Sequence, residues 1–81
     1  VFAMALGAGA AANGPYTMAI GSGSFAGAQF GVAIGYNARA TFANSVAVGN
    51  GSQTTAENTV SVGTVQLQRR ISNVADGIDS T

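Results

Sequence analysis

Short runs of alternating apolar residues recur along the chain at every fourteenth position. In each run two residues flank a smaller one, and a glycine follows at once. The five copies are Met4-Ala5-Leu6-Gly7, Met18-Ala19-Ile20-Gly21, Val32-Ala33-Ile34-Gly35, Val46-Ala47-Val48-Gly49 and Val60-Ser61-Val62-Gly63. Alternation with a period of two predicts a short half-buried strand in every copy. The regular spacing predicts a stack of equivalent coils, as in repeat proteins.

The larger residues of each run are predicted to form the repeat core. They are Met4, Leu6, Met18, Ile20, Val32, Ile34, Val46, Val48, Val60 and Val62. The glycines that follow predict tight turns, because glycine readily adopts positive φ. They are Gly7, Gly21, Gly35, Gly49 and Gly63.

Small residues recur three, five and seven positions after the repeat glycine, as Ser24, Ala26 and Ala28 do after Gly21. An even number of positions separates them from the larger residues of the run, so we expect both sets to face one interior. Each coil then has a wall of large and a wall of small side chains. The predicted fold is all-β: a parallel β-roll over residues 1–63 with two short strands in each repeat. Frequent glycine and the period of two argue against helix.

Composition limits how this fold can be stable. The chain has 81 residues and no Cys or His, which excludes disulfides and the commonest metal ligands. A chain of this size buries little apolar surface by itself. We therefore expect self-association and no cofactor or metal.

The charges are few and unevenly distributed. Arg39 is the one charged residue before Glu57, and the formal net charge is zero. No basic surface for nucleic acid is predicted, and no apolar run reaches the length of about 20 residues that spans a bilayer. No signal peptide is visible. Because the chain starts without Met and ends abruptly at Ser80-Thr81, we expect it to be a fragment of a longer protein.

The repeat pattern changes after Gly63. Gly77 keeps the repeat spacing, but Asp76 stands where the pattern requires an apolar residue. Residues 64–81 are therefore predicted to be a connector that ends the roll. Asp79-Ser80-Thr81 is expected to cap the start of a helix that lies beyond the chain.

These segments resemble the trimeric autotransporter adhesins. Residues 44–52 and 57–63 are similar to head repeats of that family, and residues 68–77 resemble its neck motif. Gln68 departs from the motif, which usually has an acidic residue there. The first two repeats also lack the Asn-Ser pair found at Asn44-Ser45.

The resemblance implies a left-handed β-roll, a side-by-side homotrimer and a neck that leads to a coiled-coil stalk. It implies a cell-surface protein of the Gram-negative outer membrane that attaches the bacterium to host matrix or host cells. In this fragment it implies no contact with membrane or nucleic acid. The neck residues expected at trimer contacts are Arg69, Arg70, Ile71, Asn73, Val74 and Asp76.

Several side chains allow two interpretations. The small residues within the strands, such as Ala33 and Ala47, form either a subunit interface or a solvent face. Phe25, Tyr16 and Tyr36 are possible exposed contacts, with a neighbouring subunit or with a ligand. Asn44 and Asn58 are expected to form a hydrogen-bonded ladder. Either Arg69 or Arg70 forms an ion pair between subunits, or both are solvated.

Four functional classes are to be compared. The leading hypothesis is an adhesin head with its neck, and the first alternative is a structural spacer within a surface fibre. An enzyme is not expected, because general acids, bases and nucleophiles are nearly absent. A segment that aggregates through unpaired strand edges is the remaining alternative.

Overall fold

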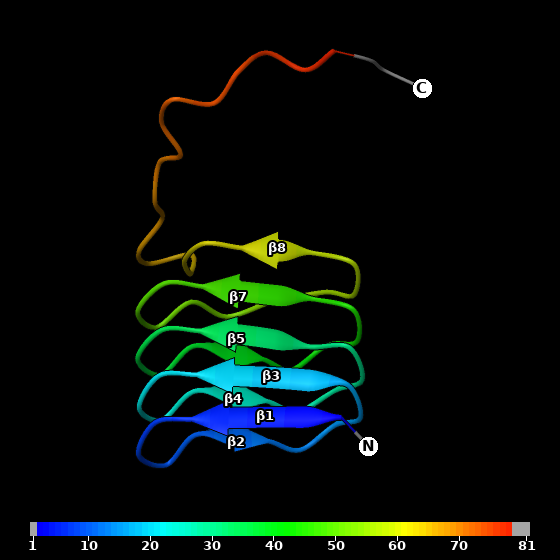
Figure 1. Ribbon diagram of the computed structural model, residues 1–81. Helices are drawn as coiled ribbons and strands as arrows, with labels where there is room; N and C mark the ends of the chain where they lie inside the picture. The colour runs from blue at the N-terminus through cyan, green and yellow to red at the C-terminus, as the bar shows by residue number, and fades with distance from the viewer. Residues whose placement is uncertain (1, 79–81) are drawn as a thin grey trace.

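The chain winds into a stack of flattened coils, seen in a computed structural model that describes residues 2–78 (Figure 1). Each complete coil has one strand in a front sheet and a shorter one in a back sheet. The front strands are β1 (Ala3–Leu6), β3 (Thr17–Ile20), β5 (Val32–Ile34), β7 (Val46–Val48) and β8 (Val60–Ser61). The back strands are β2 (Ala11–Ala12), β4 (Phe25–Ala26) and β6 (Arg39–Ala40). The described residues form no helix and no antiparallel strand pair.

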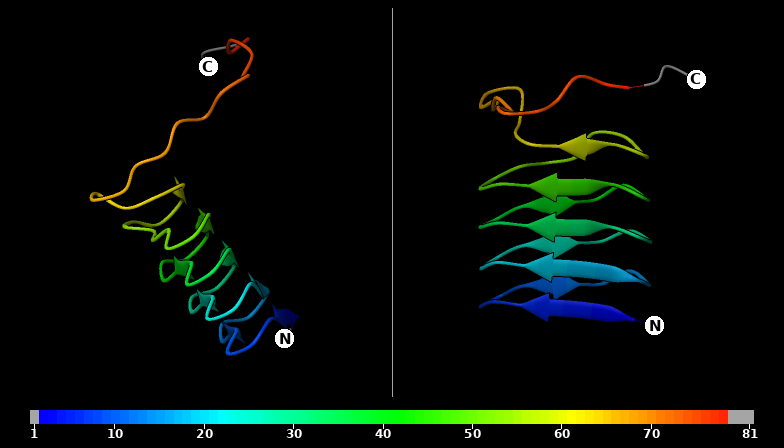
Figure 2. Two further views of the ribbon diagram at one scale, coloured as in Figure 1. Left: turned by 90° about the vertical axis from the view of Figure 1, so that its left-hand side faces the viewer. Right: turned by 45° about the horizontal axis from the view of Figure 1, so that its top comes forward.

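Both sheets are parallel, and their register repeats the sequence spacing. Met18 pairs with Val32 and Val32 with Val46, so each residue pairs with its equivalent in the next repeat. In the back sheet Phe25 pairs with Arg39, and an isolated bridge continues the row to Gln53. The predicted all-β parallel roll with one coil per repeat is confirmed, and Figure 2 shows the coils stacked one above the next.

The repeat glycines lie at the corner that follows each front strand. Gly7, Gly21, Gly35 and Gly49 all have positive φ, between 114° and 128°. A Cβ atom on Gly21 would lie 2.7 Å from the carbonyl carbon of Gly35 in the next coil. Glycine is therefore required both by backbone conformation and by close stacking. Gly63 lies at the end of the roll and does not share this positive φ.

The interior contains small side chains from both sheets. Its fully buried apolar residues are Ala19, Ala26, Ala33, Ala38, Ala40 and Ala47, and Ser24, Ser45 and Ser52 are the largest fully buried side chains. Buried hydroxyls bond to backbone carbonyls nearby: Ser24 Oγ donates to Gly21 O at 2.7 Å, and Thr17 Oγ1 donates to Gly14 O at 2.7 Å. Within the described chain, every buried side-chain N or O atom has a hydrogen-bond partner.

The prediction that the larger residues of each run form the repeat core is therefore wrong. The larger residues lie on the outer face of the front sheet, and the alanines between them point inward. The small residues of the back wall do lie inside, as Ser24 and Ala26 show. The prediction assumed that residues an even number of positions apart face the same side. That rule is valid only along extended backbone. Gly21 and Gly23, both at positive φ, reverse the alternation between β3 and β4.

Candidate functional site

The outer face of the front sheet presents a broad surface of large apolar side chains, which we call the front face. It consists of the ten residues that the sequence suggested as core: Met4, Leu6, Met18, Ile20, Val32, Ile34, Val46, Val48, Val60 and Val62. Leu6 is 61% exposed and Val60 68% exposed at the two ends of the stack, whereas Ile34 and Val48 are 37% and 38% exposed. An apolar surface that continues over all five front strands is typical of an interaction site.

The small residues of the front strands cannot form a subunit interface. Ala19, Ala33 and Ala47 have no exposed surface in the single chain. Both interpretations of this column, interface and solvent face, are therefore wrong. It is the interior wall of the front sheet, which faces the back sheet.

Aromatic residues form a row at the corner that precedes the front strands. Phe2, Tyr16 and Phe30 are one coil apart, and their ring centroids are separated by 5.7 Å and 5.6 Å. The sequence predicted Tyr16 to be an exposed contact, and it is 47% exposed. The ring contacts with Phe2 and Phe30 were missed, although the regular spacing of these three residues was a visible signal.

The same corner carries asparagine in the later coils. The Asn44 Nδ2 group donates to Asn58 Oδ1 at 2.6 Å. This confirms the predicted asparagine ladder. Thus one row of corner positions is aromatic in the first three coils and amide in the last two.

The other two aromatic candidates lie elsewhere. Phe25 is half-buried on the outer face of the back sheet, and the guanidinium carbon of Arg39 lies 5.0 Å from its ring centroid. This geometry is typical of a cation–π contact. Tyr36 is exposed beside Gly35, at the corner that follows the front strand. The structure therefore separates Tyr16 from Tyr36 across the width of the front sheet.

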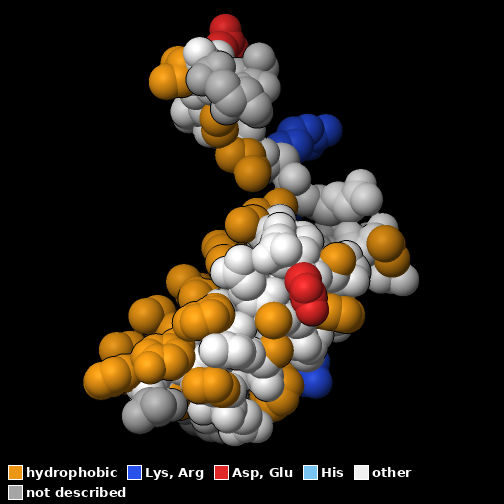
Figure 3. Space-filling model, turned by 90° about the vertical axis from the view of Figure 1, so that its right-hand side faces the viewer, with side chains coloured by type: hydrophobic (Ala, Val, Ile, Leu, Met, Phe, Trp, Pro, Cys, Tyr) orange, Lys and Arg blue, Asp and Glu red, His pale blue; other side chains and the backbone are white. Residues whose placement is uncertain are grey.

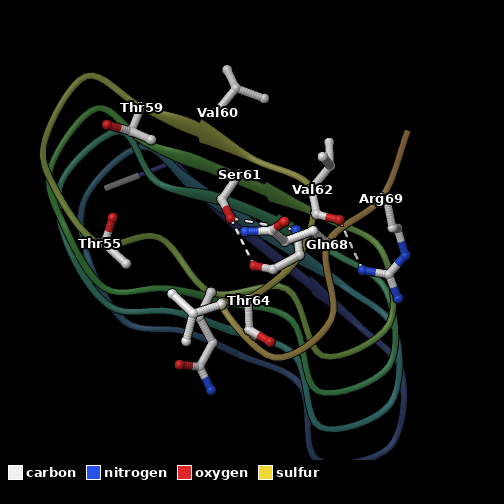
Figure 4. Close-up of a pocket in the computed structure, with 11 residues that line it drawn as sticks. Thr55, Thr59, Val60, Ser61, Val62, Thr64, Gln68 and Arg69 are labelled. Carbon is white, nitrogen blue, oxygen red and sulfur yellow. Dashed lines mark hydrogen bonds between the residues drawn. The ribbon is translucent and has the colours of Figure 1, made fainter. Parts of the chain in front are cut away.

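Arg69 folds back onto the last coils of the roll. Its guanidinium donates to Val62 O at 2.8 Å, to Asn50 O at 2.8 Å and to Ser52 Oγ at 3.3 Å. Figure 4 shows the bond from Arg69 to Val62 beside a pocket at the open end of the stack, lined by Thr55, Ser61 and Gln68 among others. Arg69 thus satisfies acceptors at the end of the roll, a role that the sequence did not reveal.

The other predicted neck contacts follow Arg69 in a segment without strands. Arg70, Ile71, Asn73, Val74 and Asp76 are all exposed, and the segment leads away from the roll (Figures 1 and 2). No ion pair joins any of the residues that the structure describes. Asp79 and the expected helix cap at 79–81 lie outside them.

Other kinds of site find little support in residues 2–78. They contain no group of three or more metal-binding acidic, His or Cys side chains. None of them belongs to a helix long and apolar enough to cross a membrane.

Comparison with known proteins identifies the class to which this architecture belongs. The family described as "YadA head domain repeat" matches residues 1–24, 26–52 and 43–64. The chain therefore belongs to this family, the head repeats of trimeric autotransporter adhesins.

One solved structure is similar to nearly the whole chain. It is the collagen-binding domain of the Yersinia adhesin YadA, 28% identical, with a TM-score of 0.50. The match covers 98% of this chain and 68% of the Yersinia chain. No curated protein sequence matches significantly. The family and this structure are adhesins, so the chain is an adhesin head module with a place on the bacterial surface.

Proposed function

We propose that the chain is the head and neck of a trimeric adhesin that attaches a Gram-negative bacterium to host extracellular matrix or host cells. The main support for the proposal is the exposed, apolar front face. Its large side chains remain accessible while the interior holds only small ones. A fold with so small a core needs a permanent partner that covers its apolar surface.

Three copies arranged around an axis meet this need. Each front face then points toward the axis, where the large residues form a shared core. The back sheets, with Phe25 and Arg39, remain on the outside. An obligate interface of this kind is more apolar than an ordinary protein surface, and the front face carries no charged side chain.

The neck is proposed to comprise residues 64–81. Ile71, Val74 and Ile78 are at least two-thirds exposed in the single chain. Apolar residues so far from the roll suggest contacts with other subunits. In this arrangement Arg69 holds the start of the neck against the last coils, and the segment beyond it continues toward a stalk.

Solution mass tests the trimer directly. Sedimentation equilibrium over a range of concentrations is expected to give three times the mass of one chain. A folded monomer at all concentrations would contradict the proposal, because the front face would then be stable in water.

Binding to immobilised collagen, fibronectin and laminin tests adhesion. Collagen is the first choice because the similar Yersinia domain is described as collagen-binding. A trimer that binds none of the three and no host cell supports a structural spacer instead. The uniform coils and the scarcity of charge favour this second candidate, since both suit a fibre that only extends another domain.

A further inference from the structure

The strongest feature that the proposed function leaves unexplained is the aromatic row at the corner before the front strands. We call Phe2, Tyr16 and Phe30 the aromatic ladder. The three side chains are 74%, 47% and 50% exposed, although Tyr16 stacks on Phe30 and Phe2 packs against Tyr16 in a tilted arrangement. Stacking alone therefore leaves much aromatic surface in water, and exposed aromatic rings are frequent in contact surfaces.

The backbone of the ladder is unfavourable for these residue types. Tyr16 and Phe30 have φ values of 57° and 62°, in the left-handed region. Asn44 and Asn58 occupy the same corner with φ values of 54° and 58°. Asparagine adopts this conformation readily, whereas a bulky residue there is an outlier that stores strain. The first coils thus have aromatic residues at a position where the asparagines of the later coils fit with less backbone strain.

The ladder is continuous with the front face. Phe2 and Tyr16 line a shallow groove together with Met4, Met18 and Val32. Figure 3 views this corner and shows hydrophobic side chains that extend from it over the edge of the stack. The groove contains no charged residue, so an apolar and uncharged occupant fits it.

We propose that the aromatic ladder of one subunit packs against the opposite corner of the next copy of this chain. The inference rests on the proposed trimer. Around a three-fold axis, the corner that precedes the front strands of one subunit meets the corner that follows those of its neighbour. That second corner presents Ile34 and Tyr36, both exposed and uncharged.

A second copy fits the ladder better than a host ligand does. The interior of the roll is made of alanine and small hydroxyl residues, so the fold needs apolar burial at all times. A ligand that binds and leaves cannot supply it. The groove floor is also the front face, which the trimer covers permanently.

The first test replaces the rings with the residue that the later coils use. Tyr16→Asn with Phe30→Asn extends the asparagine ladder and relieves the left-handed backbone. We expect folded coils but a trimer dissociation constant at least about 30-fold higher by sedimentation equilibrium, as for loss of interface hot spots. Phe25→Asn is the matched control on the back sheet, and the mass of this variant is expected to stay that of a trimer.

The second test is covalent and does not depend on how the first variant folds. The chain has no cysteine, so Phe30→Cys with Tyr36→Cys introduces the only two thiols. They lie at opposite ends of one front strand, too far apart for a disulfide within a chain. Oxidation is expected to close three chains into one covalent ring, seen as a trimer on a denaturing gel.

Each outcome bears on one proposal. A trimeric parent whose asparagine variant keeps its mass and whose cysteine variant forms no trimer overturns the ladder contact but leaves the trimer intact. A variant that stays trimeric and loses collagen binding shows that the ladder is a ligand site, which also overturns the inference. A monomeric parent contradicts the proposed function itself.

Discussion

The two faces of the front sheet are made from alternate residues of the same strands, yet they meet opposite requirements. In β5 and β7, Ala33 and Ala47 have no exposed surface, whereas Ile34 and Val48 are more than one-third exposed. The inner face selects for small size because a second sheet lies close behind it. The outer face is free to carry large side chains.

The difference shows that size, as well as hydrophobicity, decides which residues are buried. Large apolar residues are usually the ones inside a protein. A coil this short is too narrow to enclose them, so here they remain outside until another molecule covers them. The apolar core that stabilises the protein is thus expected between subunits, with only a thin alanine layer within each.

The largest effect is expected from removing the outer face. Ile34→Ser with Val48→Ser takes two large side chains out of the proposed interface, with a loss of about 4 kcal/mol per subunit at about 2 kcal/mol for each. Sedimentation equilibrium should show dissociation, and the melting midpoint should fall. Thr41→Ser, a change at an exposed residue directly after β6, is the control. An unchanged mass would mean that the front face is not the interface.

Overfilling the interior should cost nearly as much. Ala33→Leu forces a large side chain between the two sheets, and we expect about 3 kcal/mol lower stability in denaturant unfolding. Gln53→Leu adds the same side chain at an exposed position of the back-sheet row, outside the proposed interface, and serves as the control, with a change within about 0.5 kcal/mol. Equal effects of the two variants would contradict the assignment of the faces.

The junction of roll and neck is expected to show a smaller effect. Arg69→Ala removes three hydrogen bonds at the end of the stack. Because the guanidinium is partly exposed, we expect a loss of about 1–2 kcal/mol, measured as a lower melting midpoint. Arg70→Ala is the control, since Arg70 is exposed and makes no hydrogen bond to a described residue. An equal shift for both would favour a role in subunit contacts over capping of the roll.

The smallest effect concerns the outer face of the back sheet. Arg39→Gln removes the cation above Phe25, and a partly exposed contact of this kind contributes about 0.5–1 kcal/mol. Thermal unfolding should detect a slight decrease without a change in mass. Loss of the trimer in this variant would indicate that the back sheet, and not the front face, forms the subunit interface.

Much of the fold could be predicted because the repeats have a constant length and each repeat forms one coil. The strands at Thr17–Ile20 and Val32–Ile34, the corners at Gly21 and Gly35 and the Asn44–Asn58 ladder all follow from it. The aromatic ladder obeys the same spacing but was missed, because its members lie outside the apolar runs. The capping role of Arg69 joins residues 7 to 19 positions apart and has no local pattern.

By itself the sequence determined the repeat, the parallel stacking, the turn glycines and the family, since each depends on residues at a constant spacing. Only the tertiary structure decided which side of each strand is the interior. Alternation along a strand defines two faces but does not show which one is buried. The positive-φ corners between front and back strands interrupt the alternation, so the inward side of one strand cannot be inferred from the other. The packing of the two sheets settled the choice, because the side chains between them are alanine, serine and threonine, whereas the larger apolar residues of the same strands face outward.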